Sequence, residues 1–177
     1  MQLYIVRHGQ TDGNINKIMD GIRDIDLNEN GIGQAQVTRD NLKNLNFDLV
    51  ICSPLTRTKH TMEIININNN PVIFDERIME RDCGEFTGKG FDSLDRDLYW
   101  NYHDKTIYKK AESIEHLFDR VYNFLDEIKE KYKDKNILLV THEGITKVIN
   151  CYFNGIPDDG NLQSLGLKNC EVKTYKL

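Results

Sequence analysis

The sequence contains no long hydrophobic run and no excess of positive charge. Its longest apolar runs span only a few residues, whereas a helix that crosses a bilayer needs about 20. Arg7 follows the first residue too closely to leave room for the apolar core of a signal peptide. The net charge is −5, from 23 Lys and Arg against 28 Asp and Glu, and a nucleic-acid-binding protein would more often carry a basic stripe. We therefore expect a cytoplasmic protein with no membrane segment and no nucleic-acid partner.

The sequence also lacks the spacings that mark disulfide frameworks and metal sites. Its four cysteines form no CxxC pair, so reduced thiols are expected. No two histidines have a metal-ligand spacing such as HExxH, and the carboxylate clusters of a metal-dependent hydrolase are absent. We predict that the protein uses no metal ion and no other cofactor. Cys83 follows Glu80 by three residues and is either a packed small residue or a redox-sensitive or substrate-facing thiol.

Four short apolar runs are typical of buried β-strands, because they are continuous and rich in branched or aromatic residues. They cover residues 3–6, 49–52, 72–74 and 137–141. A fifth stretch, residues 171–177, alternates polar and apolar residues and is predicted to form an edge strand.

Helices are predicted between these strands, at residues 31–45, about 54–67, 113–128 and 145–153. The third has the clearest 3.6-residue period, with Ser113 as its N-cap, and Pro54 is expected in the first turn of its helix. The alternation of strands and helices implies an α/β fold with a mainly parallel sheet between helices. We predict one domain, residues 1–177, with a small cap segment at about 84–110 and one antiparallel edge strand.

Charged side chains follow the ends of the predicted strands. Arg7 and His8 follow the first strand, Arg57 the second and His142 the fourth, and Glu80 comes a short segment after the third. Open α/β sheets bind ligands beyond the carboxyl ends of their strands, so we expect these side chains at one rim. Each alone has an ordinary structural explanation, such as a helix-surface charge. Together they are groups that bind or attack an anion, and they predict a phosphate-handling site.

The ordered motifs resemble the histidine phosphatase (phosphoglycerate mutase-like) superfamily over essentially the whole chain. The motifs are RHGQT at 7–11 with Asn14; Gly21, Asp24, Leu27, Gly31, Gln34 and Ala35; SPLTRT at 53–58 with Thr61; Glu80 before Gly84; ES at 112–113; and THEG at 141–144. The resemblance implies a three-layer α/β/α sandwich and a metal-independent chemistry that runs through a phosphohistidine.

Carried over to the matching positions, the resemblance implies His8 as the nucleophile and Glu80 as the proton donor. The predicted catalytic residues are Arg7, His8, Arg57, Glu80 and His142. The predicted substrate- and phosphate-binding residues are Arg7, Asn14, Gly21, Arg57, His142 and Glu143. Glu143 departs from the family pattern, in which two glycines often follow the second histidine. A carboxylate at this position either points away from the pocket or disfavours highly charged substrates.

The chemistry accounts for these residue types. Phosphoryl transfer is mostly positioning and neutralisation of the phosphoryl oxygens, which two arginines and a second imidazole suit. His8 must be neutral to attack, and Arg7 and Arg57 disfavour its protonated form. A partner for its other ring nitrogen, such as the backbone near Gly9, must select the tautomer. Glu80 must protonate the leaving oxygen although a cationic pocket favours the carboxylate, so burial under the cap or the bound anion has to offset this effect.

We predict a phosphomonoester hydrolase that acts on a small phosphorylated metabolite. Glu80 and Glu112 lie only 32 positions apart, and the family's mutases typically carry a longer insertion there that keeps water from the phosphohistidine. The alternatives are a cofactor-dependent phosphoglycerate mutase and a non-catalytic module that binds phosphorylated ligands.

The sequence leaves the substrate open, because the family spans sugar phosphates, cobalamin precursors (α-ribazole phosphatase-like members) and phosphoproteins. Five aromatic residues at 86, 91, 100, 102 and 108 either cover an apolar leaving group or form the core of the cap. The C-terminal edge strand leaves a homodimer possible.

Overall fold

The computed structural model describes residues 2–176. One sheet contains five strands in the order β3-β2-β4-β1-β5. The strands are β1 (Gln2–Arg7), β2 (Leu49–Cys52), β3 (Val72–Phe74), β4 (Asn136–Thr141) and β5 (Val172–Lys176). The first four pair in parallel, and β5 pairs antiparallel with β1. The predicted mainly parallel sheet with one antiparallel edge strand is confirmed.

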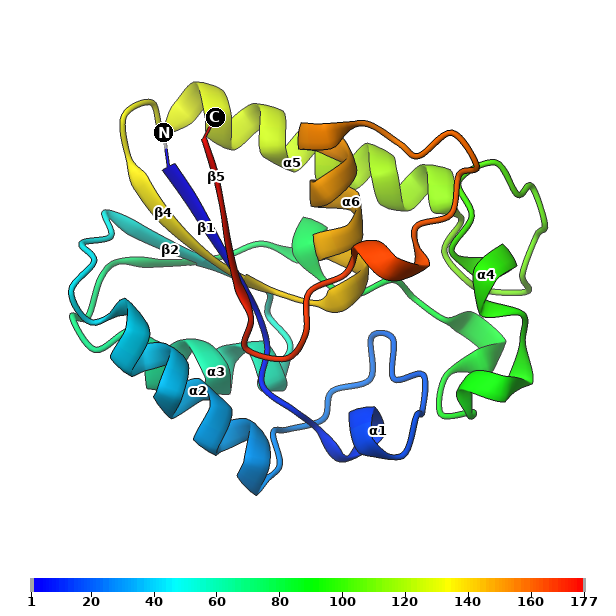
Figure 1. Ribbon diagram of the computed structural model, residues 1–177, viewed down its shortest axis with the longest axis horizontal. Helices are drawn as coiled ribbons and strands as arrows, with labels where there is room; N and C mark the ends of the chain where they lie inside the picture. Colours follow the sequence, from blue (N-terminus) through cyan, green and yellow to red (C-terminus); the bar gives the residue numbers. More distant parts are fainter. Residues whose placement is uncertain (1, 177) are drawn as a thin grey trace.

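Helices cover both faces of the sheet. The four long ones are α2 (Glu29–Leu42), α3 (Thr56–Ile65), α5 (Ile114–Lys131) and α6 (Glu143–Asn154). Figure 1 shows α5 and α6 on one face of the sheet and α2 and α3 on the other. The predicted three-layer α/β/α sandwich is therefore confirmed.

Each strand contributes side chains to both faces of the sheet, because successive side chains point in opposite directions. In β4, Leu139 packs in the cluster that contains the apolar face of α5, whereas Val140 packs in the cluster that contains residues of α2 and α3. Both side chains are fully buried. A strand between two helical layers therefore has to be apolar at every position, which explains the continuous apolar runs in the sequence.

Two helix starts are decided by local hydrogen bonds. The Ser113 side chain accepts a hydrogen bond from His116 N and caps α5, as predicted. Asn28 caps α2 by accepting from Gly31 N, so this helix begins at Glu29, two residues before the predicted start.

Two details differ from the prediction. The helix after β2 begins at Thr56, so Pro54 precedes α3 and does not lie in its first turn. The strand at residues 72–74 lies at the edge of the sheet, where Ile73 and Phe74 are 40% and 50% exposed. The prediction of a buried strand is wrong at this position, because a run of three residues is too short for periodicity to separate an edge from a centre.

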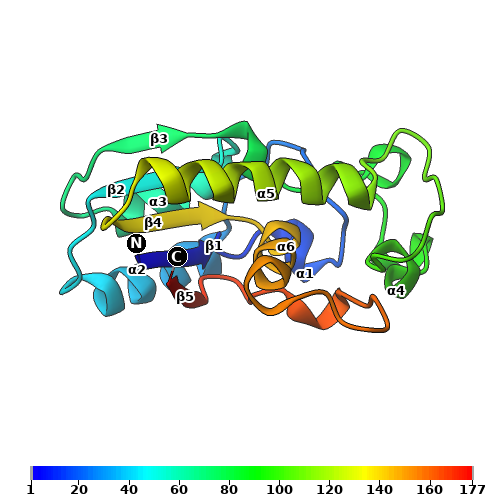
Figure 2. The same cartoon turned by 90° about the horizontal axis from the view of Figure 1, so that it is seen from above.

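Two irregular segments cover the carboxyl ends of the parallel strands. The first, residues 10–28, contains α1 (Asp12–Ile15), and the second, residues 84–110, contains α4 (Arg96–Tyr99) and is called the cap segment below. Figure 2 shows α4 beyond this end of the sheet. Met19 N donates to Lys89 O at 2.9 Å and Phe91 N to Lys17 O at 2.8 Å, so main-chain hydrogen bonds join the two segments.

Four single-turn 3₁₀ helices complete the chain. They are η1 (Glu76–Ile78), η2 (Gly84–Phe86), η3 (Phe91–Ser93) and η4 (Gln163–Leu165). Within residues 2–176, no helix combines the length and apolar character that a membrane crossing requires.

Two glycines of α2 have contrasting surroundings. A Cβ atom on Gly31 would lie 2.2 Å from Gln10 O, whereas a Cβ on Gly33 would meet nothing within 4 Å. Gly31 therefore allows the chain that follows His8 to pass directly against α2.

We expect Gly31→Ala to destabilise the protein by about 1–3 kcal/mol, because the added methyl group overlaps the main chain. Gly33→Ala, the matched control in the same helix, should stabilise it by about 0.5–1 kcal/mol through the better helix propensity of alanine. Urea unfolding measures both effects, and stabilisation by both variants would contradict the packing argument.

Candidate active site

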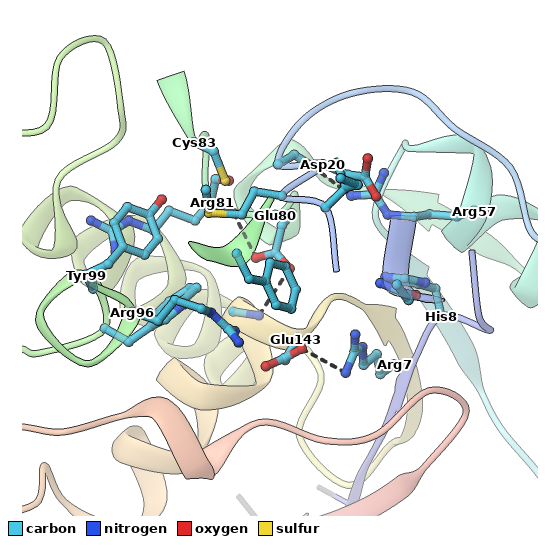
Figure 3. Close-up of a pocket in the computed structure, with 17 residues that line it drawn as sticks. Arg7, His8, Asp20, Arg57, Glu80, Arg81, Cys83, Arg96, Tyr99 and Glu143 are labelled. Atoms are coloured by element: carbon cyan, nitrogen blue, oxygen red, sulfur yellow. Dashed lines mark hydrogen bonds and ion pairs between the residues drawn. The ribbon is translucent and has the colours of Figure 1, made fainter. Parts of the chain in front are cut away.

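A pocket of about 600 Å³, open mouth included, lies at the carboxyl end of the parallel strands, below the two covering segments. Figure 3 shows Arg7, His8 and Arg57 on one side, Arg81, Arg96 and Tyr99 on the other, and Glu80 and Glu143 between them. Seven of the eight predicted site residues line the pocket: Arg7, His8, Asn14, Gly21, Arg57, Glu80 and Glu143. The eighth, His142, lies against His8, with ring centroids 5.3 Å apart.

His8 follows β1 and is 4% exposed. Its Nδ1 lies 2.7 Å from Gly9 O. A carbonyl oxygen only accepts hydrogen bonds, so Nδ1 carries the proton and Nε2 of the neutral ring keeps its lone pair. Burial, followed by the charges of Arg57 and Arg7, lowers the pKa of His8 well below 6.5. The ring is therefore a neutral base with a free Nε2 at physiological pH.

His142 follows β4 and is fully buried. Its Nε2 lies 2.7 Å from the Ser53 hydroxyl, and its Nδ1 has no hydrogen-bond partner within residues 2–176. Burial is the main cause that lowers the pKa of His142 well below 6.5, with Arg57 and His8 contributing. Ser53 belongs to a recognised motif, but its contact with His142 spans 89 positions and was not predicted.

Arg57 extends from the first turn of α3 and is 2% exposed. Its guanidinium donates to Gly21 O at 2.8 Å and to Arg23 O at 2.7 Å. Gly21 has φ +51°, a conformation that glycine adopts without strain. The first covering segment therefore holds Arg57 through main-chain carbonyls, and no carboxylate of residues 2–176 lies within 4 Å of its guanidinium.

Arg7 and Asn14 complete the polar wall around His8. Arg7 Nη1 donates to Leu167 O at 2.8 Å, while its buried Nε has no partner within the described residues. The Asn14 Oδ1 accepts from Thr11 N and from the Asn169 amide. Asn169 also donates to His8 O at 3.0 Å, so the segment before β5 supports the site. No sequence motif indicated this contact.

Glu80 reaches the pocket from the segment after η1. Its two oxygens accept from Arg81 N at 2.9 Å and from Gly144 N at 3.2 Å. A Cβ on Gly144 would lie 2.2 Å from Glu80 Oε1, so only glycine at position 144 allows this approach. These contacts fix the direction of the carboxyl group toward the space beside His8.

A half-buried ion pair supports the Glu80 main chain on the side away from the pocket. Arg120 binds both oxygens of Glu112, at 2.6 and 2.8 Å. The same guanidinium donates to Arg77 O at 2.6 Å and to Glu80 O at 3.3 Å. Glu112, recognised in the sequence only as part of a motif, therefore positions the Glu80 segment through Arg120.

The far wall contains residues that the sequence analysis did not assign to the site. Arg81, Arg96 and Tyr99 lie on this wall, and Ile18, Met19 and Asp20, which were also not assigned, line the pocket from the first covering segment, with Asp20 near Arg57. None lies in a recognised motif, and the only available signal was their place in the two covering segments. Phe91 and Trp100 also line the pocket, and Trp100 is at the same time 8% exposed within the core. Trp100 therefore has both roles predicted for the aromatic residues, because it covers the pocket and packs in the core.

Cys83 lines the pocket and is buried. Burial raises the pKa of its thiol to about 11, so it is protonated at physiological pH and is a poor nucleophile. Within the described part of the chain, no three His, Cys, Asp or Glu side chains are grouped to hold a metal ion.

Comparisons with known proteins identify the family. The family model of the histidine phosphatase superfamily (branch 1) matches residues 3–177. Uncharacterized phosphatase PhoE of Bacillus subtilis (strain 168) is 34% identical over 166 residues, covering 93% of this chain and 82% of PhoE. Probable phosphoglycerate mutase GpmB of Salmonella choleraesuis (strain SC-B67) is 31% identical over 180 residues, covering 97% and 83%.

Among solved structures, Bacillus stearothermophilus YhfR matches with a TM-score of 0.89 at 24% identity, covering 99% of this chain and 91% of YhfR. This likeness concerns the fold. The chain belongs to the histidine phosphatase superfamily, and the predictions of the family and of a phosphatase of this superfamily are confirmed.

The buried neutral histidines make stability depend on pH. The unfolded chain takes up protons as the pH falls through about 6.5, whereas folded His8 and His142 do not. The contribution of these two histidines to the free energy of unfolding is therefore fully present above this pH and is lost as the pH falls below it. We expect His142→Asn to reduce the slope of unfolding free energy between pH 6.5 and 5 by up to about 1.4 kcal/mol per pH unit.

Urea unfolding at several pH values measures this slope. His103→Asn, which removes an exposed imidazole, is the control and should keep the wild-type slope. Equal slopes in all three proteins would show that folded His142 takes up protons like the unfolded chain.

Proposed function

We propose that this member of the histidine phosphatase superfamily hydrolyses small phosphomonoesters through a phosphohistidine on His8. The observation that carries the proposal is a pair of unsatisfied buried atoms beside His8. Arg7 Nε and His142 Nδ1 have no hydrogen-bond partner within residues 2–176. Buried polar atoms without partners are costly, and the oxygens of a phosphoryl group on His8 are suitable acceptors for both.

The hydrogen bond to Ser53 suits this role of His142. If the Ser53 hydroxyl donates to Nε2, the neutral ring carries its proton on Nδ1 and can donate it to a phosphoryl oxygen. Arg7, Arg57 and Asn14 face the same space and supply further donors. Gly21 acts indirectly in this proposal, through the carbonyl that holds Arg57.

The proposed reaction has two steps. First, His8 Nε2 attacks phosphorus, the bond to the leaving oxygen breaks, and that oxygen takes the Glu80 proton. Second, a water molecule gives a proton to Glu80 and attacks the phosphorus of phosphohistidine, which releases inorganic phosphate and restores Nε2. Neither step requires a metal ion, because the arginines neutralise the charge on the phosphoryl oxygens and His142 donates a hydrogen bond to one of them.

The lining of the pocket and the short cap segment support hydrolysis of small substrates. The pocket is concave and combines apolar surface with convergent polar groups, as small-molecule sites do, and the short cap lets water reach the phosphohistidine. Phosphoglycerate mutase is a second candidate function because of the name of GpmB; in a mutase the phosphoryl group returns to an organic acceptor.

We also propose a cytoplasmic location and a homodimer that pairs through the outer edge of β5.

A screen of phosphomonoesters with and without excess EDTA tests the proposal. The wild type should release inorganic phosphate in both conditions, and His8→Ala should release none and form no acid-labile phosphoprotein. Arg57→Ala should lose about 10²–10³ in kcat/KM, because one charge that faces the transition state is removed. Arg39→Ala, on the exposed face of α2, is the control and should resemble the wild type.

Two other results would overturn hydrolysis. Phosphoglycerate interconversion with little free phosphate would identify a mutase. Binding of phosphorylated compounds without any turnover would identify a non-catalytic module.

The role of Glu80 is tested by the leaving group. Glu80→Gln should lower kcat/KM for an alkyl phosphate at least about tenfold more than for p-nitrophenyl phosphate, because nitrophenolate departs without a proton. Initial rates with both substrates measure the ratio. An equal loss for the two substrates would remove Glu80 from the role of proton donor.

A further inference from the structure

Glu143, the residue that departs from the family pattern, points into the pocket. It is the first residue of α6, and its Oε2 lies 2.9 Å from Arg7 Nη1. Its Oε1 lies 3.2 Å from Lys147 Nζ, one helical turn further along. Figure 3 shows its carboxylate between the guanidinium groups of Arg7 and Arg96. The sequence left two directions open for this side chain, and the structure selects the inward one.

The surrounding atoms hold Glu143 in this position. A Cβ on Gly166 would lie 2.6 Å from Glu143 Cγ, so the chain at Gly166 packs directly on the side chain. Lys147 is fully buried and donates to the carbonyls of Leu162 and Gln163. The chain at Gly166 therefore blocks Glu143 on the side of η4, and its carboxylate lies beside Arg7.

Glu143 is negatively charged at physiological pH. Burial opposes ionisation, but the charges of Arg7 and Lys147 outweigh burial and lower the pKa of the carboxyl group. The pocket thus contains a fixed negative charge directly beside one of its phosphate-binding arginines.

This charge limits what Arg7 can bind. Arg7 Nη1 is already engaged by Leu167 O and Glu143, while the unpartnered Nε remains for the reacting phosphoryl group. A second anionic group that extends from that phosphoryl group toward Arg96 would approach the Glu143 carboxylate. Like charges a few ångströms apart in a partly buried pocket repel strongly, and such repulsion is an effective source of specificity.

We propose that Glu143 is a specificity-determining residue that restricts the site to substrates with one phosphoryl group and no second anionic group beside it. This inference rests on the proposed function, because it assumes that the phosphoryl group binds at His8. The remaining wall suits a neutral leaving group, since Phe91 and Trp100 supply apolar surface. The Arg96 guanidinium lies over the Phe91 ring, 4.0 Å from its centroid, so this cation packs against an aromatic face.

The test compares two non-hydrolysable ligands that differ by one anionic group, ethylphosphonate and 1,2-ethylenediphosphonate. Calorimetry gives Kd for both ligands with the wild type, Glu143→Gln and Glu130→Gln. The last variant makes the same charge change on the exposed end of α5. In Glu143→Gln, Kd for the diphosphonate should fall about tenfold more than Kd for ethylphosphonate. In Glu130→Gln, the ratio of Kd for the diphosphonate to Kd for ethylphosphonate should remain that of the wild type.

A second variant separates charge selection from damage to the fold. Glu143→Gln leaves the buried Lys147 without its carboxylate, so Glu143→Gln/Lys147→Met removes both charges together. Thermal unfolding identifies the variant that is folded, and the ratio of the two Kd values should shift in the same direction in either one, by less in the double variant because a cation is removed with the carboxylate. A ratio unchanged from the wild type in a folded variant would overturn the proposal.

The binding measurements do not depend on turnover. If the wild type releases phosphate but the ratio does not move, charge selection fails and hydrolysis stands. If the ratio moves but no monoester is hydrolysed, the proposed hydrolysis fails while charge selection stands.

Discussion

The site depends on one electrostatic constraint, which is that positive charge is buried beside two neutral imidazoles. Arg57 is 2% exposed, and the partners of its guanidinium are the carbonyls of Gly21 and Arg23. These dipoles orient the charge without cancelling it. Burial, reinforced by the field of this charge, keeps His8 and His142 unprotonated. The same field attracts an anion, so one arrangement prepares both the nucleophile and the phosphate-binding site.

The sheet makes this arrangement possible because its parallel strands end at one edge. His8 N donates to Thr141 O and Ser53 N donates to Val140 O. The residues that follow β1, β2 and β4 therefore lie side by side. A histidine 134 positions away along the chain is thereby brought against His8. The covering segments are themselves irregular, yet main-chain hydrogen bonds between them and the Arg57 contacts hold them over the strand ends.

Charge balance separates the two halves of the pocket. Around His8, Arg7 contacts Glu143, whereas no carboxylate of residues 2–176 lies within 4 Å of the Arg57 guanidinium. On the opposite side Arg81 packs over the Tyr99 ring at 3.7 Å and Arg96 over Phe91, so aromatic faces accommodate these charges. Glu143 lies between the halves and forms ion pairs with Arg7 and with the buried Lys147. The pocket therefore holds a fixed negative charge between its two groups of arginines.

The sequence by itself determined the fold class and the residues around the reacting position. Continuous apolar runs require burial on both faces, and that condition places strands between two helical layers and their following residues at one rim. Arg7, His8, Arg57 and His142 were found for this reason, because each ends a strand, directly follows one or lies in the first turn of the next helix. Only the tertiary structure decided the far wall, the direction of Glu143 and the supports from Ser53, Asn169 and Arg120. These contacts join residues that are distant in the chain or lie in irregular segments, where packing, not a local hydrophobic or capping pattern, decides which side chains meet.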